Sequence, residues 1–411
     1  MLRNDKRFPG DPTLSTTAEA TVDSAVAELI EATNFETERD DEIRGRQYDM
    51  GLAWVHFPKG WGGLDVSPKL QRNVDQAMRA AGARSIESKH FFGLTMAGPT
   101  IESHGSEALK SQMLRSTFTG EDVWCQLFSE PGAGSDLAGL ACKAVRDGDE
   151  WVITGQKVWN TLAHLANRGM LVARTDPEVP KHRGITYFGI DMTAPGVEVR
   201  PLRQITGEAE FNEVYLTEVR VPDSDRIGDV GQGWGVAMTT LMNERVTIGG
   251  GGGGPTRGSG AIAEAVQIWK EESDQNAVQK DELMKLWIEA EVLRLTNMRA
   301  SQNRRTGIPG PEGSIAKLMF AEVNRSIYEL CVDLLGASAL TDYSYENIRA
   351  DSLGLVGPPG SSRKMFLRSR ANSIEGGTSE IQRNILGERV LGLPGEVRAD
   401  KELPWTDVPR N

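Results

Sequence analysis

The strongest constraint on the fold of this 411-residue chain is a hydrophobic pattern that changes its period twice. Apolar residues recur at helical spacing from about residue 15 to 120, alternate in short segments between 123 and 230, and return to helical spacing from 234 to 392. The two periods suit different elements, so the order of structure is predicted to be helical, β, helical. We expect an α+β multidomain fold with domains at 1–122, 123–230 and 231–394.

Local signals place several elements inside these domains. A helix is expected over 106–118, where Gly120 follows as a terminator. Alternation predicts strands over the segments 151–154, 184–190 and 213–221. Strong helix formers fill 281–299 and 316–335. Residues 1–16 are expected to form a loose arm, and 395–411 an irregular surface tail.

Composition excludes several classes of protein. A net charge of −12 argues against nucleic acid and anionic membranes, which both require a basic face. No segment approaches the roughly 20 apolar residues of a membrane span. The three cysteines form no CxxC pair and fit buried free thiols in a reducing compartment. Together with a start that lacks the apolar run of a signal peptide, these features predict a cytoplasmic protein.

Six consecutive glycines, Gly249–Gly254, interrupt the C-terminal helical pattern and precede Pro255. Glycine costs about 1 kcal/mol per helical position relative to alanine, so the run predicts a break between helices. A second interpretation is that the missing side chains leave space for a bulky substrate.

Two glycine-rich polar segments carry the functional signal. The first, Trp124–Asp136, reads WCQLFSEPGAGSD, and the second, Gly155–Thr161, reads GQKVWNT. Each places polar and aromatic residues beside the end of a predicted strand, which suits a flat polar ligand held by hydroxyls and backbone groups. A third segment, Ile374–Arg383, reads IEGGTSEIQR, with paired glycines before a capped helix.

Together the three segments resemble the acyl-CoA dehydrogenase family over residues 50–393. The resemblance implies a helical N-terminal domain, a middle β-barrel or sandwich and a C-terminal four-helix bundle. It also implies an FAD-dependent oxidoreductase of lipid β-oxidation that delivers electrons to an electron-transferring flavoprotein, with no metal in its site. FAD contacts carried over from the family are Gln126, Phe128, Ser129, Trp159, Thr161, Thr378, Ser379 and Glu380. Acyl-CoA contacts carried over are Ser135, Arg245, Gly376 and Gly377.

The resemblance leaves two candidates for the base that removes the α-proton of the substrate. Medium- and short-chain members use the glutamate directly before the Gly-Thr of the C-terminal motif. Gly376 occupies that place here, and Glu375 lies one residue earlier. Isovaleryl-CoA and long-chain members carry the base on the first helix of the C-terminal domain, before an arginine, where Glu244 and Arg245 stand. We expect Glu244 to be the base, with Glu375 as the alternative and Gly376 offering a backbone N–H to the thioester carbonyl.

Two cross-subunit segments of homotetrameric relatives are altered. The position of an Arg-x-x-Phe-Gly segment is taken by the acidic stretch 269–279, which cannot clamp a pyrophosphate by charge. A Gln-x-Leu-Gly-Gly run appears as Asp333–Ala337. Both a homotetramer with other contacts and a mixed tetramer with a paralogous chain fit this pattern. Two further functions stay open: a non-catalytic partner of an active paralogue, and a flavin-dependent oxidase that uses O₂.

Overall fold

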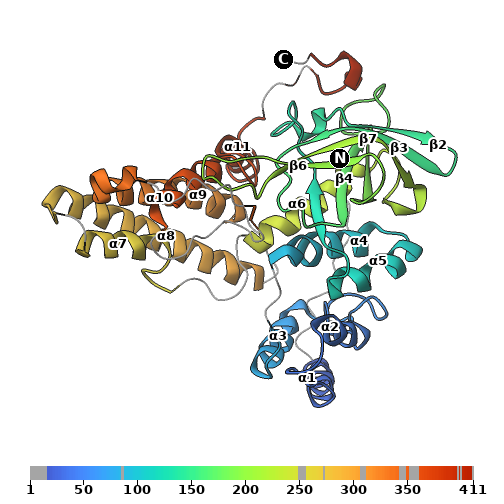
Figure 1. Cartoon of the computed structure of the whole chain (residues 1–411), viewed down its shortest axis with the longest axis horizontal. Helices are drawn as coiled ribbons and strands as arrows, with labels where there is room; N and C mark the ends of the chain where they lie inside the picture. Colours follow the sequence, from blue (N-terminus) through green and yellow to red (C-terminus); the bar gives the residue numbers. More distant parts are fainter. Residues whose placement is uncertain are drawn as a thin grey trace.

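The computed structural model describes residues 16–84, 88–248, 256–271, 274–305, 312–341, 349–350, 361–395, 398 and 400–409. Figure 1 shows three parts that follow one another along the chain. Helices α1 to α5 come first and lie in the lower part of the view, the sheet lies at the upper right, and the C-terminal helical bundle extends to the left. The predicted helical, β, helical order is confirmed.

The N-terminal helices have clear local determinants. They are α1 (Thr16–Glu31), α2 (Asp40–Asp49), α3 (Gln71–Ala80), α4 (Gly98–His104) and α5 (Glu107–Thr119). The hydroxyl of Ser106 caps α5 by accepting the N–H of Leu109 at 3.2 Å. Gly120 ends α5 with φ +89°, a conformation that favours glycine. The helix predicted over 106–118 is therefore confirmed.

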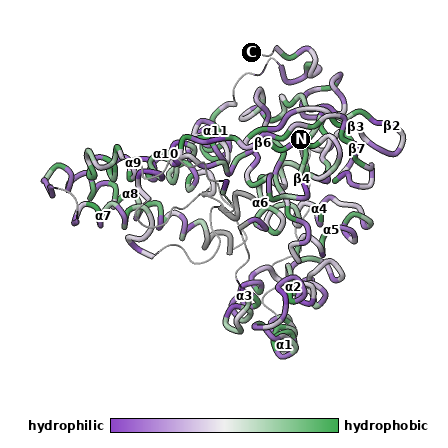
Figure 2. Tube along the Cα trace, in the orientation of Figure 1, coloured by the Kyte–Doolittle hydropathy of each residue, from purple (hydrophilic) through white to green (hydrophobic). Residues whose placement is uncertain are grey.

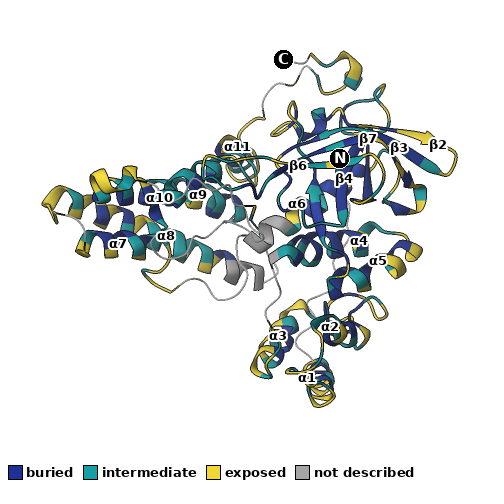
Figure 3. Cartoon of the chain, viewed as in Figure 1, coloured by how far each residue is buried: buried dark blue, intermediate teal, exposed yellow. Residues whose placement is uncertain are grey.

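The strands of the middle part join one mixed sheet. They are β1 (Trp124–Leu127), β2 (Lys143–Asp147), β3 (Glu150–Lys157), β4 (Arg168–Arg174), β5 (Ile185–Asp191), β6 (Val197–Pro201), β7 (Asn212–Pro222) and β8 (Arg226–Ile227). Their order is β6-β7-β3-β2-β4-β5-β8, and β1 pairs in parallel with β4. The predicted segments 151–154 and 213–221 lie in β3 and β7, and the segment 184–190 lies in β5 except for its first residue. Figure 3 shows β4 buried and β2 largely exposed.

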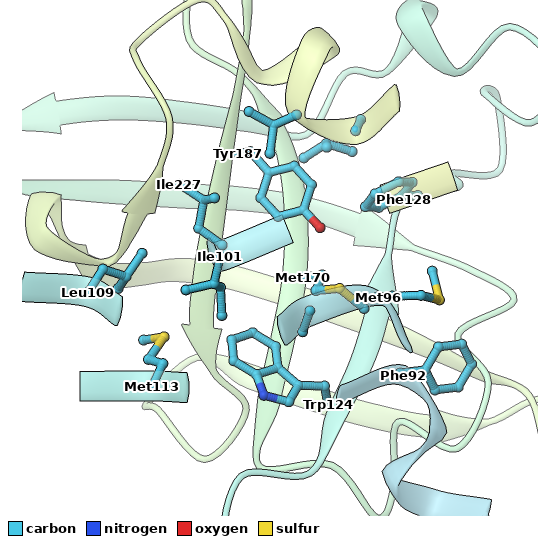
Figure 4. Close-up of a cluster of buried hydrophobic side chains, with 14 of the residues drawn as sticks. Phe92, Met96, Ile101, Leu109, Met113, Trp124, Phe128, Met170, Tyr187 and Ile227 are labelled. Carbon is cyan, nitrogen blue, oxygen red and sulfur yellow. The ribbon is translucent and has the colours of Figure 1, made fainter. Parts of the chain in front are cut away.

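The N-terminal helices and the sheet share one hydrophobic core. Figure 4 shows Met96 and Ile101 from the helical part beside Trp124, Phe128 and Tyr187 from the sheet and its edge. Large side chains from the helices and from the sheet therefore pack in the same core. This packing fixes the position of β1 relative to α4 and α5.

The C-terminal part consists of α6 (Gly233–Ile248), α7 (Ala261–Glu271), α8 (Ala277–Arg305), α9 (Glu312–Leu335), α10 (Ser362–Arg368) and α11 (Ser379–Arg389). The predicted helical stretches 281–299 and 316–335 lie in α8 and α9. Figure 2 shows hydrophobic and hydrophilic residues alternating along the bundle. Gly249–Gly254 lie outside the described residues. Among the described helices, none has the length and apolar character needed to cross a membrane.

Helix α6 connects the parts. The hydroxyl of Thr240 lies 3.0 Å from that of Thr100 on α4 and 3.1 Å from that of Tyr187 on β5. These groups are buried, so each hydroxyl needs its partner. The contact holds α6 against both the N-terminal helices and the sheet.

Candidate functional site

The ends of β1 and β3 are joined by a buried cation. Lys157 has no exposed surface, and its Nζ donates to the carbonyl of Phe128 at 2.9 Å and pairs with Glu130 at 2.8 Å. The Glu130 carboxylate also accepts the N–H groups of Ala141 and Cys142, at 2.7 and 3.0 Å. A buried ion pair of this kind needs such additional hydrogen bonds to balance desolvation. The network fixes the segment in which the first polar motif begins.

The loop after β3 is backbone-strained and displays an aromatic ring. Trp159 has φ +62° and its side chain is 58% exposed, while Leu162 has φ +53° and is buried. Positive φ in a bulky residue costs free energy and is retained where the surroundings impose it. The Trp159 ring meets Phe211 edge-on at a centroid distance of 5.8 Å. The outer surface of the indole remains available to a ligand.

Amide hydrogen bonds impose this strain. Asn160 donates from Nδ2 to the carbonyl of Gln126 at 2.8 Å and exchanges backbone hydrogen bonds with Asn212 at 3.0 and 3.1 Å. The N–H of Leu162 donates to the carbonyl of Glu210 at 2.8 Å. The loop is thus bound to β1 on one side and to the start of β7 on the other. Gln126, Ser129 and Thr161 lie half-buried around Trp159.

Asn212 extends this network to the C-terminal part. Its side-chain amide donates to the carbonyl of Asn160 at 3.0 Å and faces Nδ1 of His164 at 3.2 Å, while its Oδ1 accepts from Arg349 at 3.2 Å. The other ring nitrogen of His164 lies 2.8 Å from the carbonyl of Ala350. These partners require a neutral ring that accepts at Nδ1 and donates at Nε2. Burial lowers the pKa of His164, which agrees with that form.

The paired glycines near the C-terminus adopt the conformation that only glycine takes easily. Gly376 and Gly377 have φ +64° and +90°. Lys317 of α9 donates to the carbonyl of Gly377 at 2.6 Å, and Gln382 of α11 donates to that of Gly376 at 3.1 Å. Thr378 caps α11 by accepting the N–H of Ile381 at 3.2 Å, as the sequence predicts.

Glu375, the alternative base, is engaged in a structural ion pair. Arg368 donates to its two carboxylate oxygens at 3.1 and 2.9 Å, and Asn372 donates to Oε1 at 2.8 Å. Arg368 also pairs with Glu210 at 3.2 Å, and both residues are almost completely buried. A carboxylate that holds a buried guanidinium in two hydrogen bonds is poorly placed to accept a substrate proton.

Phe211 lies between the two halves of the site. Its ring contacts Trp159, and the guanidinium of Arg368 lies 5.7 Å from its centroid. The strained platform and the paired-glycine turn therefore meet at Phe211, although more than 200 residues separate their motifs in sequence. The site combines an exposed indole, half-buried polar groups and a glycine turn at a helix N-terminus.

Comparisons with known proteins identify this arrangement. Three sequence models match the chain: the acyl-CoA dehydrogenase N-terminal domain at 12–121, middle domain at 125–219 and C-terminal domain at 231–391. The chain belongs to the acyl-CoA dehydrogenase family. Acyl-CoA dehydrogenases are FAD-dependent oxidoreductases that act on CH–CH groups, and their three-domain α+β architecture is the one described above.

Mycobacterial acyl-CoA dehydrogenases are among its relatives. The chain is 39% identical to FadE34 of Mycobacterium tuberculosis over 84% of its own length, but it spans only 45% of FadE34. It is 34% identical to IpdE1 of the same organism, over 85% of this chain and 86% of IpdE1. The crystal structure of the ChsE4–ChsE5 complex of M. tuberculosis superposes with a TM-score of 0.67 at 27% identity, covering 94% of this chain and 100% of that one.

The residues present in this acyl-CoA dehydrogenase fit FAD. Trp159 offers a ring surface. Ser129 and Thr161 are half-buried hydroxyl residues of the same two segments, since the carbonyl of Ser129 accepts the N–H of Val158 at 2.9 Å and Thr161 follows Trp159 by two residues. Two buried acceptors, Oδ1 of Asn160 and Oε1 of Gln382, have no hydrogen-bond partner in the described part of the chain. Buried acceptors are normally satisfied, so their position beside the platform and the glycine turn favours a ligand with N–H or O–H donors.

Other predicted site residues differ in exposure. Phe128 is buried edge-on against Tyr187 at 5.8 Å, so its ring supports the platform from within (Figure 4). Ser379 is buried and donates to Glu322 of α9 at 3.2 Å. Ser135 and Glu380 are exposed. Glu244 and Arg245 lie in the last turns of α6, and their side chains are outside the described residues.

Sequence reasoning missed the residues that hold the site together, notably Phe211, Asn212, Lys317 and Arg368. Asn212 could have been recognised from the sequence, because it is a polar residue at a position that the alternating pattern of β7 assigns to the buried face. A buried polar residue needs hydrogen-bond partners inside the protein. Arg368 sits among other basic residues and Lys317 is a single lysine in a helical segment, so neither carries a comparable signal.

Proposed function

We propose that this chain catalyses the α,β-dehydrogenation of an acyl-CoA thioester to the trans-2-enoyl-CoA. Glu244 takes the proton from the α-carbon, and the hydride leaves the β-carbon. When bound, FAD supplies the acceptor for that hydride at its N5 position. The two electrons then pass to an electron-transferring flavoprotein, so both electrons and the proton are accounted for.

The hydrogen bonds of Glu375 are the observation that favours Glu244 as the base. Its carboxylate holds Arg368 and Asn372, which makes it a structural partner of the glycine turn. Glu244 follows Thr240 by one helical turn, and Thr240 contacts Tyr187 beside Phe128. Residue 244 therefore lies on the helix that Thr240 joins to the sheet, which is where a base has to stand to reach a substrate bound at the platform.

The remaining site residues bind and orient the substrate in this proposal. Gln126, Phe128, Ser129, Trp159 and Thr161, with Thr378, Ser379 and Glu380, surround FAD. Gly376 gives its N–H to the thioester carbonyl, where negative charge develops as the proton leaves. Ser135, Arg245 and Gly377 contact the acyl-CoA. A cytoplasmic location stays a prediction from the sequence.

An exposed apolar stripe on α8 supports assembly with another acyl-CoA dehydrogenase chain. Its members are Met284, Ile288, Val292, Leu295 and Met298, each at least 39% exposed. Their spacing of three or four residues places them on one face of the helix, and exposed stripes of this size usually mark an interface. Because ChsE4–ChsE5 is a complex of two different chains, we favour a mixed tetramer over a homotetramer as the arrangement to test first.

The decisive experiment is anaerobic titration of the FAD-loaded protein with a panel of acyl-CoA thioesters. Wild type should lose flavin absorbance with at least one of them. Glu244→Gln should slow that loss by about 10²–10⁴-fold, the usual contribution of a general base. The matched variant Glu375→Gln should keep a rate within about tenfold of wild type, since its role is structural.

Each outcome is informative. Loss of reaction in Glu375→Gln but not in Glu244→Gln, with both proteins folded, would reverse the assignment of the base. A chain that holds FAD only when co-expressed with a paralogue would support the mixed tetramer. Stable FAD binding by the purified chain as a tetramer of identical subunits would contradict it.

A further inference from the structure

The C-terminal tail, residues 400–409, lies against the middle domain. The N–H of Trp405 donates to the carbonyl of Val179 at 2.9 Å, and that of Thr406 donates to Pro177 at 3.2 Å. Pro404 forms an isolated bridge with Pro180. The tail is irregular, as the sequence predicts, but backbone hydrogen bonds give it a defined register on the segment that follows β4.

Trp405 covers a buried arginine that holds the loop after Ser135. Arg174 is 3% exposed and donates to the carbonyls of Ala138 at 2.5 Å and Leu140 at 3.2 Å. Its guanidinium lies 4.9 Å from the centroid of the Trp405 ring, within cation–π range. The indole Nε1 of Trp405 donates to the carbonyl between those two, that of Gly139, at 3.2 Å. Tail and β4 together bind three successive carbonyls.

A charged contact holds the other side of the same loop. The Nζ of Lys181, on a side chain only 7% exposed, lies 2.9 Å from Asp136 and 2.9 Å from Asp400 of the tail. Asp136 directly follows Ser135. A largely desolvated ammonium contributes more to stability than an exposed ion pair, because it stays buried and loses a partner if Asp136 moves away. Asp400 therefore fixes the position of Lys181, and Lys181 that of Asp136.

The tip of the loop is open on its other side. Ser135 is exposed, and an added Cβ at Gly132 or Gly134 would meet nothing within 4 Å. The tip of this loop has small, exposed residues, and the rest of the loop is rigidly held. Such a tip suits the close approach of a ligand. The polar tip thus faces solvent, while its support comes from residues 136–140 and the tail.

We propose that the C-terminal tail acts as a brace: it holds the loop of residues 131–141, which contains Ser135, in the position that binds the acyl-CoA. Asp400 and Trp405 are its positioning residues. The inference rests on the proposed function, because that function makes Ser135 a substrate contact. Neither residue touches the reacting atoms. The brace acts on substrate affinity and leaves the chemistry at FAD unchanged.

The test compares Asp400→Asn and Trp405→Ala with wild type in the full-length FAD-loaded protein. Asp407→Asn is the matched control, since it removes the same charge from an exposed tail residue whose carboxylate, within the described part of the chain, accepts from the Thr406 hydroxyl at 3.4 Å. Two readouts are taken: KM and kcat for the best acyl-CoA, and hydrogen exchange of the amides of residues 131–141 without substrate.

Both variants should raise KM roughly three- to tenfold, as expected for loss of a cation–π or semi-buried ionic contact, with kcat and FAD content unchanged. Exchange of the loop amides should accelerate in both and stay at the wild-type rate in Asp407→Asn. Wild-type KM and wild-type exchange in both variants would overturn the brace. So would a parallel loss of FAD, kcat and thermal stability, which would indicate a general structural role.

The two readouts separate this proposal from the proposed function. If wild type reacts with no acyl-CoA, the dehydrogenase assignment fails. The proposal that the tail positions a substrate-binding loop then fails with it, whatever the hydrogen exchange shows. If wild type reacts and loop exchange alone changes, with KM unaltered, the brace is overturned and the dehydrogenase assignment stands.

Discussion

The two halves of the site are held by different forces. The platform around Trp159 is fixed by backbone and amide hydrogen bonds between neighbouring segments of the sheet, and its central residues are uncharged. The glycine turn at Gly376 directly precedes α11 and is fixed by the long side chains of Lys317, Arg368 and Gln382.

The difference shows which kinds of hydrogen bond are available at strand ends and which are available at a turn between helices. Strand ends lie close enough for short amides to satisfy one another, so the strained loop 159–162 is held by uncharged groups, and the buried Lys157–Glu130 pair lies at the end of β3 before it. A turn between helices must be reached from a distance, and lysine and arginine have the reach. The cost is desolvation of charged groups, which makes this half depend on intact ion pairs.

The largest effect is expected from breaking the ion pairs of the glycine turn. Arg368→Met leaves Glu210 buried without its cation and should lower the free energy of unfolding by about 3–5 kcal/mol. Chemical denaturation measures this, with exposed Arg383→Met as a control that should cost less than about 1 kcal/mol. Adding Glu210→Gln to Arg368→Met should restore part of the loss. A loss in Arg368→Met no larger than in the control would mean that the two halves are held alike.

A smaller effect is expected at the platform, where strain and function are opposed. Trp159→Gly removes the cost of a positive φ, about 1 kcal/mol, and loses only the packing of a largely exposed ring. We therefore expect a free energy of unfolding within about 1 kcal/mol of wild type. FAD affinity, measured by flavin fluorescence titration, should fall roughly tenfold because a ring contact is lost. Unchanged FAD affinity would contradict the role of Trp159 as a ligand surface.

The smallest effect is expected from His164, the titratable ring that faces the side-chain amide of Asn212. Burial lowers the pKa of His164 below its value in the unfolded chain, so the neutral ring contributes stability that is complete above about pH 6.5. That contribution is lost as the pH falls below this value, because the unfolded chain then binds the proton more readily. Thermal unfolding at about pH 7.5 and 5.5 should therefore show a smaller decrease for His164→Gln than for wild type. Equal decreases would exclude His164 as a contributor.

Local signals predicted the fold better than they predicted the supports of the site. Ser106 and Gly120 act within a few residues of α5, so their caps could be predicted from spacing alone. The platform positions Ser129, Trp159 and Thr161 came from the family resemblance. The contact of Arg368 with Glu210 and Phe211 depends on how α10 docks on the sheet, and no local pattern contains that information.

Glu375 illustrates the same limit. Its position one residue before Gly376 made it an alternative base, since the sequence gives the order of residues but not their partners. The structure supplies Arg368 and Asn372 as those partners.

The Glu130 network has a consequence for how this protein can change. Lys157 and the N–H groups of Ala141 and Cys142 tie the two ends of the segment 130–142 to one carboxylate, so the segment is closed at its base independently of its tip. Substitutions or insertions at the exposed tip would then leave the sheet below undisturbed. Natural variation can accumulate there without loss of folding, which makes this closed loop a place where selectivity among acyl-CoA esters could diverge between related genes.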